Sequence, residues 1–188
     1  MSILENYIST YFGIQGPVAS RVSDFFKPKV IKKGDHFLKE GSYCKQMGFI
    51  QSGLIREYFH YNGKEVTKWI STEGYFIMDI SSFLFRQPSR WNIEALTDCS
   101  LYVIDHLKYQ EISKVVPEWA EMEKLFLAKC FSVLEDRVAQ HLSMSAEERY
   151  LQLFHYNKAL FNTVPLQYLA SMLGMTPETL SRLRKKIS

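Results

Sequence analysis

The chain has 188 residues, of which 46% are hydrophobic and 23% charged, and its formal net charge is +3. This balance is that of a soluble globular protein with enough apolar residues for one domain or two small ones. No apolar run approaches the roughly 20 residues that a membrane helix needs. The N-terminus also lacks a signal-peptide core, so we expect a cytoplasmic protein with no membrane partner.

The first hundred residues predict short helices followed by a barrel. Residues 3–27 carry apolar residues at helical spacing and are predicted to form short helices that end at Pro28. From Val30 to about Leu107, short alternating runs are separated by turn residues. The strongest hairpin signal is Asn62-Gly63. Many short strands with this punctuation predict an antiparallel jelly-roll barrel with an aromatic interior.

Beyond Leu107 the apolar periodicity becomes helical. A short helix is predicted over residues 108–115, before Pro117, and a long helix from Glu118 to about Leu142. The broad apolar face of the long helix has two interpretations, an interior helix of a monomer or a coiled-coil-like dimer seam beside the barrel. The residues expected at that seam are Trp119, Met122, Phe126, Cys130 and Val133.

The C-terminal segment predicts a capped helix and then two helices joined by a tight turn. Ser145-Ala146-Glu147-Glu148 is a capping box that opens the first of these helices. Pro165 suits the first turn of the next helix, and Gly174 ends it where left-handed backbone is cheapest for glycine. Ala170 leaves room for a second helix to cross steeply. That second helix has an N-cap, a first-turn proline and an apolar stripe, supplied by Thr176, Pro177, Leu180, Leu183 and Ile187.

The excess positive charge lies in this last segment. Residues 164–188 hold four basic residues and one acid, whereas the preceding 163 residues hold 19 of each. The outward face of the last helix can reach base edges and phosphates. The sequence therefore predicts a helix-turn-helix that binds double-stranded DNA. The alternative is a helical hairpin with a solvated basic face. The outward residues are Glu178, Ser181, Arg182, Lys185 and Lys186.

The order of parts resembles the Crp/Fnr family of bacterial transcription regulators over essentially the whole chain. Residues 175–182, with the sequence MTPETLSR, are similar to the recognition helix of that family. The resemblance implies an α+β fold with a barrel sensor or effector domain over residues 1–116. It also implies a long dimerisation helix over 117–142 and a helix-turn-helix domain over 143–188. Softer matches fall where the family places barrel turns, at Lys33-Gly34-Asp35, Glu40-Gly41, residues 49–53 and residues 73–76.

The resemblance implies a transcription regulator that binds a near-palindromic site as a homodimer, with RNA polymerase as a further partner. Carried over to this chain, Glu178, Ser181 and Arg182 are the base readers. Arg182 can pair with guanine and Glu178 can accept from cytosine. The Glu-Ser-Arg combination is that of the Fnr-type branch and implies a TTGA-like half-site. The residues expected at phosphates are Thr176, Thr179, Arg184, Lys185 and Lys186.

The nucleotide cassette of the family is degenerate in this chain. In the family, Gly-Glu followed several residues later by Arg-Ser or Arg-Ala holds the ribose and the phosphate. Here Met78-Asp79 stands at the first pair, and Arg90 lies about one residue out of register. We therefore expect no bound cofactor and no response to cyclic AMP. A regulator that responds to a cyclic nucleotide or another small ligand is the alternative. The candidate pocket residues are Phe76, Met78, Asp79, Arg90 and Trp91.

A metal-dependent oxygenase of the cupin type is the more distant alternative. Such a site needs two or three histidines and a carboxylate at ligand spacing. His36 and Glu40 offer one of each, and the three cysteines are scattered without metal-type spacing. No nucleophile elbow or phosphate-binding loop is present in the sequence. We therefore expect neither an enzyme nor a metal site. The histidines that fit no ligand pattern are His60, His106, His141 and His155.

Overall fold

The computed structural model describes residues 2–187, and the side chain of Ile187, predicted above to extend the last apolar stripe, lies outside the described part. The helices are α1 (Ile3–Phe12), α2 (Pro17–Ser23), α3 (Ile80–Phe85), α4 (His106–Val115), α5 (Trp119–Ser143), α6 (Ala146–Tyr156), α7 (Leu160–Thr163), α8 (Leu166–Met172) and α9 (Pro177–Ile187). The strands are β1 (Lys27–Ile31), β2 (His36–Leu38), β3 (Gln46–Ser52), β4 (Ile55–Tyr61), β5 (Lys64–Ser71), β6 (Phe76–Ile77), β7 (Asn92–Ala95) and β8 (Cys99–Asp105).

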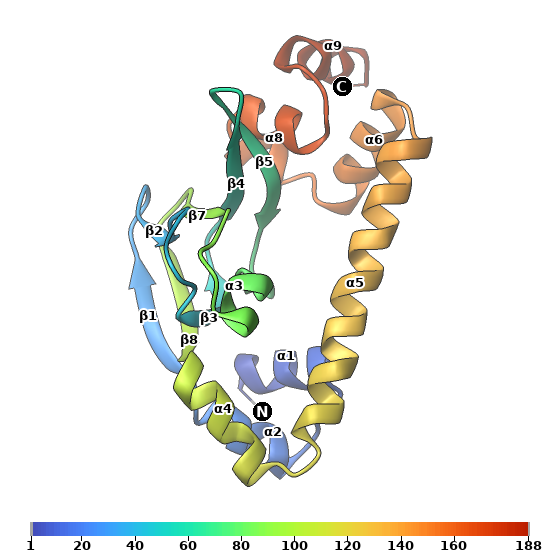
Figure 1. Ribbon diagram of the computed structural model, residues 1–188. Coiled ribbons are helices and arrows are strands. Elements are labelled where there is room, and N and C mark those ends of the chain that lie inside the picture. Colours follow the sequence, from blue (N-terminus) through green and yellow to red (C-terminus); the bar gives the residue numbers. More distant parts are fainter. Residues whose placement is uncertain (1, 188) are drawn as a thin grey trace.

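The strands form two antiparallel four-stranded sheets, with the orders β1-β8-β3-β6 and β2-β7-β4-β5 (Figure 1). This arrangement confirms the predicted jelly-roll-like architecture. The hairpin between β4 and β5 turns at Asn62 and Gly63, which both have positive φ, at 49° and 72°. Positive φ at both central residues matches the twist of the flanking strands, and for this reason Asn-Gly marks such turns in sequence.

Two details of the barrel differ from the prediction. Pro28 lies within β1 and does not end a helix, since α2 already stops at Ser23. β1 pairs only with β8, so a proline without an amide hydrogen is tolerated at this sheet edge. The short helix α3 was not predicted. It begins because the Asp79 side chain accepts from the Ser82 amide, and it ends at Arg86, where φ is 55°.

The N-terminal half of α5 is part of the core of its own chain. Helices α1 and α2 close one end of the barrel, and α5 starts beside them and runs past the barrel to the opposite end (Figure 1). The Phe12 ring of α1 stacks on Trp119 at 4.9 Å and on Phe126 at 4.6 Å between ring centroids. Trp119 is 4% exposed and Phe126 2%. The predicted dimer seam is therefore wrong at these two residues, because leaving this core would expose both rings to water.

Helices α6 to α9 gather at the far end of α5 around a second cluster of buried residues (Figure 1). The capping box of α6 is confirmed, with Ser145 and Glu148 each accepting from the other's backbone amide. The cluster includes Ile70 from β5 of the barrel together with Leu169 and Leu180 from α8 and α9. Among the described helices, none is long and apolar enough to cross a membrane.

Candidate nucleic-acid interface

Helix α9 has one buried and one exposed face. It starts at Pro177 after Thr176, whose Oγ1 accepts from the Thr179 amide at 3.2 Å. Leu180 and Leu183 are buried against α8. Residues 178, 181, 182 and 185 recur at helical spacing on the other side. A shallow concave surface there is lined by Pro177, Glu178, Ser181, Arg182 and Lys185. The three predicted base readers thus share one accessible surface.

The Glu178 carboxylate is held in its charged form. Hydrogen bonds from its own backbone amide and from the Thr176 hydroxyl lower its pKa below the ordinary value. The carboxylate also lies in the first turn of α9, where the helix dipole favours a negative charge. An ionised glutamate is an acceptor only, so it can accept from an amino group on a base edge and repels phosphates.

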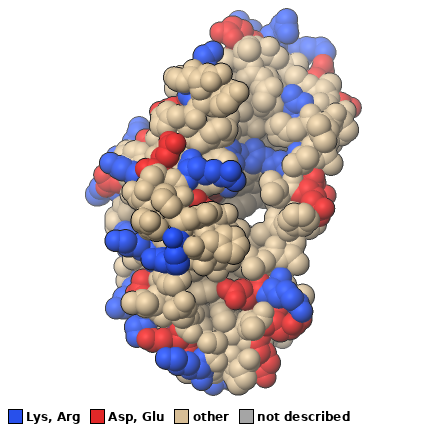
Figure 2. Space-filling view, viewed as in Figure 1, with Lys and Arg blue, Asp and Glu red and all other residues tan. Residues whose placement is uncertain are grey.

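The residues predicted to contact phosphates differ in their exposure and in the partners they already have. Arg184 and Lys185 are exposed in the last turn of α9, where cations are favoured by the dipole. Lys186 is paired with both carboxylate oxygens of Glu147 at 2.9 Å, so it would have to exchange that ion pair for a phosphate. Thr179 is half-buried beside its N-cap partner. The basic side chains at the α9 end of the molecule are interspersed with acids (Figure 2).

The turn between α8 and α9 has the geometry that the sequence predicts. Ala170 is completely buried where the two helices meet, and its carbonyl accepts from the Met175 amide at 3.0 Å. Gly174 has a φ of 66°, in the left-handed region that glycine adopts at least cost. A Cβ at this position would make only ordinary van der Waals contact with the imidazole of His141, so the backbone conformation is what favours glycine here. The turn therefore fixes how α9 projects from α8.

The exposed apolar residues of α5 lie on a different face from the predicted seam. Phe131, Leu134 and Val138 are 61%, 51% and 51% exposed, and half-buried Leu127 continues their line. Their spacing of four, three and four residues is that of a two-heptad coiled-coil stripe. The sequence contained this signal, but the greater number of apolar residues on the core-facing side obscured it. Of the predicted seam, Val133 is exposed, whereas Met122 and Cys130 partly pack on the core.

The cassette region is filled by its own side chains. Asp79 is buried, and its carboxylate accepts from the Ser82 amide at 3.1 Å and from the Ser89 hydroxyl at 2.8 Å. Arg90 is exposed and lies over the Trp91 ring, 5.2 Å from its centroid. A cyclic phosphate placed at the start of α3 would face this carboxylate, and the Ser82 amide there already donates to Asp79. These internal bonds of Asp79 argue against a cyclic phosphate at this point.

The five predicted pocket residues do not form one cluster. Phe76 packs in the main core within 6 Å of the rings of Tyr11, Phe12, Phe49 and Phe126. Met78 packs partly on the same core, while Arg90 is on the surface. The prediction of a shared pocket is wrong in this respect, because Phe76 completes the contact between β6 and α1.

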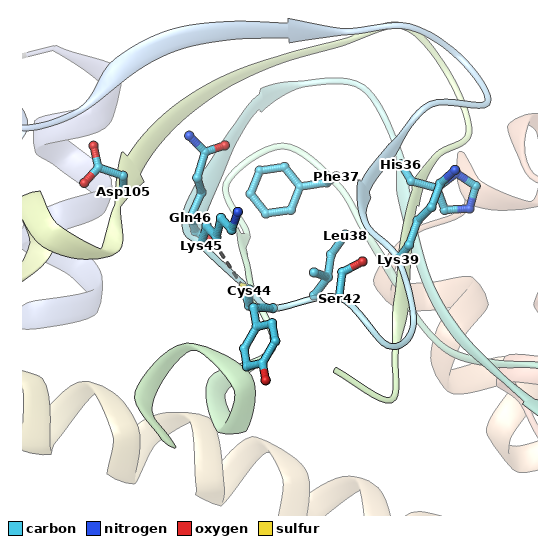
Figure 3. Close-up of a pocket in the computed structure, with 10 residues that line it drawn as sticks. His36, Phe37, Leu38, Lys39, Ser42, Cys44, Lys45, Gln46 and Asp105 are labelled. Carbon is cyan, nitrogen blue, oxygen red and sulfur yellow. Dashed lines mark hydrogen bonds between the residues drawn. The ribbon is translucent and has the colours of Figure 1, made fainter. Parts of the chain in front are cut away.

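A cavity of about 540 Å³ lies instead beside β2 and the start of β3 (Figure 3). None of the predicted pocket residues is among those that line it. Its Gln46 side chain accepts from Lys29 at 2.8 Å, and burial raises the pKa of its Cys44 thiol. The residues around it are His36, Phe37, Leu38, Lys39, Ser42, Tyr43, Cys44, Lys45, Gln46 and Asp105.

The one histidine and the one acid considered for a cupin-type site each bond to a different residue. His36 Nε2 lies 3.2 Å from the Tyr58 hydroxyl, and Glu40 pairs with His60 at 2.9 Å. Within residues 2–187 no group of three or more His, Cys, Asp or Glu side chains could hold a metal ion.

Residues 28–114 match the family model of the cyclic nucleotide-binding domain. This range covers β1 to α4, so the two sheets and their short helices carry the domain. No curated protein matches the chain in sequence.

Solved structures of the same architecture extend the likeness beyond the barrel. FixK2 from Bradyrhizobium japonicum is 16% identical with a TM-score of 0.72, covering 86% of this chain and 84% of that one. The catabolite activator protein of Thermus thermophilus is 18% identical with a TM-score of 0.60, covering 99% and 86%. Cyclic-AMP-bound PfPKA-R is 18% identical with a TM-score of 0.53, and this chain spans only 40% of that chain. At such low identities these likenesses show the fold alone.

Proposed function

We propose that the chain is a sequence-specific DNA-binding transcription regulator of the Crp/Fnr type, which acts as a homodimer and does not require a cyclic nucleotide. The observation that carries this proposal is the exposed face of α9, where Glu178, Ser181, Arg182 and Lys185 share one surface. α8, the glycine turn and α9 serve as a helix-turn-helix, with α9 as the recognition helix in the major groove.

The side chains of this face divide into base contacts and backbone contacts. Arg182 can donate two hydrogen bonds to the O6 and N7 atoms of one guanine, and Glu178 can accept from a cytosine amino group. Ser181 lies between them and can donate or accept. Lys185, Arg184 and, once released from Glu147, Lys186 contact phosphates, which position the helix without reading sequence.

A second copy of the chain covers the exposed stripe of α5. Leu127, Phe131, Leu134 and Val138 have coiled-coil spacing. Leu127 is partly packed on the core of its own chain, whereas Phe131, Leu134 and Val138 are more than half exposed. Pairing two such stripes about a two-fold axis buries both and places two α9 helices on one face of the DNA. The target expected for such a dimer is a near-palindromic site with half-sites one helical turn, about 34 Å, apart. RNA polymerase bound at a neighbouring promoter is the expected further partner.

A regulator controlled by a cyclic nucleotide is the second candidate, and the family match over residues 28–114 favours it. The internal bonds of Asp79 argue against it, since a nucleotide would have to displace Ser89 and face a carboxylate. An effector of another chemistry remains compatible with the proposed function.

The proposal is tested by binding assays with selected DNA and paired variants. Arg182→Ala should weaken binding by about 1–3 kcal/mol at one guanine and relax the preference there, because only that base loses its partner. Lys185→Ala should weaken all sequences alike and reduce the salt dependence by about one released counterion. Arg21 is exposed on α2, far from α9, so Arg21→Ala removes the same charge there and serves as the control. If Arg182→Ala bound every DNA sequence with the same affinity as the parent, the assignment of α9 as the recognition helix would be refuted.

A further inference from the structure

The C-terminal helices dock on the barrel through the β4–β5 hairpin. β5 is the edge strand of its sheet, and α8 packs along it (Figure 1). The Thr67 amide of β5 donates to the Ser171 hydroxyl of α8 at 2.9 Å. An edge strand normally leaves such amides to water or to another strand. Here a side chain 104 residues further along the chain satisfies the amide, so the docking is specific in register.

Arg56 lies at the centre of this contact and is 1% exposed. Its guanidinium is sandwiched between the rings of Tyr58 on β4, at 4.2 Å, and Tyr168 on α8, at 3.7 Å. Its Nη1 is paired with Glu65 at 2.7 Å and its Nε donates to Thr67 Oγ1 at 2.9 Å. One of the two stacked rings thus comes from the barrel. The other comes from the C-terminal helices, which also carry the exposed face of α9, called here the reading face. A buried arginine that stacks on one ring from each part and also forms an ion pair holds the barrel and α8 in one relative geometry.

Two further arginines attach the end of α8 to α5 and α6. Arg137 lies over the Trp69 ring of β5 at 4.4 Å and donates to the Met172 carbonyl at 3.4 Å. Arg149 donates to the Leu173 carbonyl at 2.9 Å. These carbonyls immediately precede the Gly174 turn, so their direction sets the direction of α9. Burial lowers the pKa of Arg137 to about 10.

The docked arrangement leaves the reading face open. α9 lies beyond α8, at the end of the molecule opposite α1 and α2 (Figure 1). Glu178, Arg182 and Lys185 are exposed while Arg56 is buried. The contact therefore does not block DNA. It fixes the direction in which the recognition helix points.

We infer that the β4–β5 hairpin positions the DNA-reading helices and that Arg56 is the positioning residue, an inference that rests on the proposed function. In a dimer, each barrel then sets the direction of its own recognition helix, and the spacing of the two helices follows from these contacts. Binding a full palindromic site is strong because the second half-site is met at high effective concentration. That advantage is lost when the helices are free to swing.

The test compares Arg56→Met with the parent on a full site, on an isolated half-site and on full sites whose spacer differs by one or two base pairs. Methionine keeps an apolar side chain of similar length in the buried position. We expect unchanged half-site binding, a loss of about tenfold or more on the full site, and a broadened spacer preference. Lys68→Met is the matched control, because Lys68 lies on the neighbouring strand β5, next to Thr67, and its side chain pairs with Glu57 on the sheet face opposite Arg56.

A purely stabilising role for Arg56 would not change the spacer preference. Unchanged full-site affinity and spacer preference in Arg56→Met would overturn the inference. Hydrogen exchange of the Thr67 amide supplies a readout that needs no DNA, and it should accelerate in Arg56→Met and in Ser171→Ala but not in Lys68→Met. If the parent bound no DNA, the proposed function would fail, while unchanged Thr67 exchange in Arg56→Met would refute the docking role by itself.

Discussion

The exposed stripe of α5 allows a direct test of dimerisation by Leu134→Glu. Leu134 is 51% exposed in the single chain, so a charge there leaves the core of its own chain undisturbed. Burying a fully exposed leucine side chain contributes about 1.5–3 kcal/mol, and about half of Leu134 remains to be buried, so each copy contributes about 0.8–1.5 kcal/mol. Two-fold symmetry doubles this to about 1.5–3 kcal/mol for each dimer. Because about 1.4 kcal/mol is a factor of ten, the dimer dissociation constant should rise by about 10- to 10²-fold.

Sedimentation velocity over a concentration series measures this change, with circular dichroism to check that the chain stays folded. Leu125→Glu is the matched control, since Leu125 is 56% exposed on the same helix but nine residues away, on the opposite side. Phe126→Ala is the contrasting variant, since it removes a ring of the core and should cost about 3–5 kcal/mol of folding free energy. A Leu134→Glu protein that remains a dimer at the concentrations where the parent does would refute the stripe.

Two other predictions concern the barrel and its core. Because the Asp79 carboxylate already accepts two hydrogen bonds within the chain, cyclic AMP should not raise the unfolding temperature. A ligand that did bind would add about 2.7 kcal/mol to the free energy of unfolding at 100 times its dissociation constant. A rise of several degrees would therefore favour the alternative of a regulator controlled by a cyclic nucleotide. Burial, followed by a 2.6 Å hydrogen bond to Glu123, raises the pKa of Tyr109 above its ordinary value of about 10. The folded state then keeps a proton that the unfolded state releases, so stability present below about pH 10 should fall as the pH rises further. The fall should be shallower in Tyr109→Phe, and equal slopes of unfolding temperature against pH would contradict this assignment.

Local sequence rules predicted the elements whose causes are local. Asn62-Gly63, the Ser145 capping box and the Thr176-Pro177 helix start each depend on contacts within four residues, and the structure has all three. The long helix was predicted within one residue at each end. Pattern and capping chemistry suffice for such features because neighbouring residues determine them.

The parts that sequence did not predict depend on distant residues. Which side of α5 packs on the core is decided by Phe12, more than 100 residues earlier in the chain. The burial of Arg56 depends on Tyr168, which arrives from the other end of the chain. An isolated arginine in an alternating strand carries no sign of such a partner. Similarly, the hydrogen bond from Ser89 to Asp79 could not be predicted, because it requires α3, the unpredicted helix between the two residues.

The proposed regulator is a homodimer in which the exposed face of each α9 helix recognises DNA sequence. In vitro selection of DNA from a random pool tests this most directly, since it reports binding, half-site and spacing together. We expect enrichment of a near-palindromic site with TTGA-like half-sites one helical turn, about 34 Å, apart. Enrichment that Arg182→Ala reproduces without change, or no enrichment over the starting pool, would contradict it.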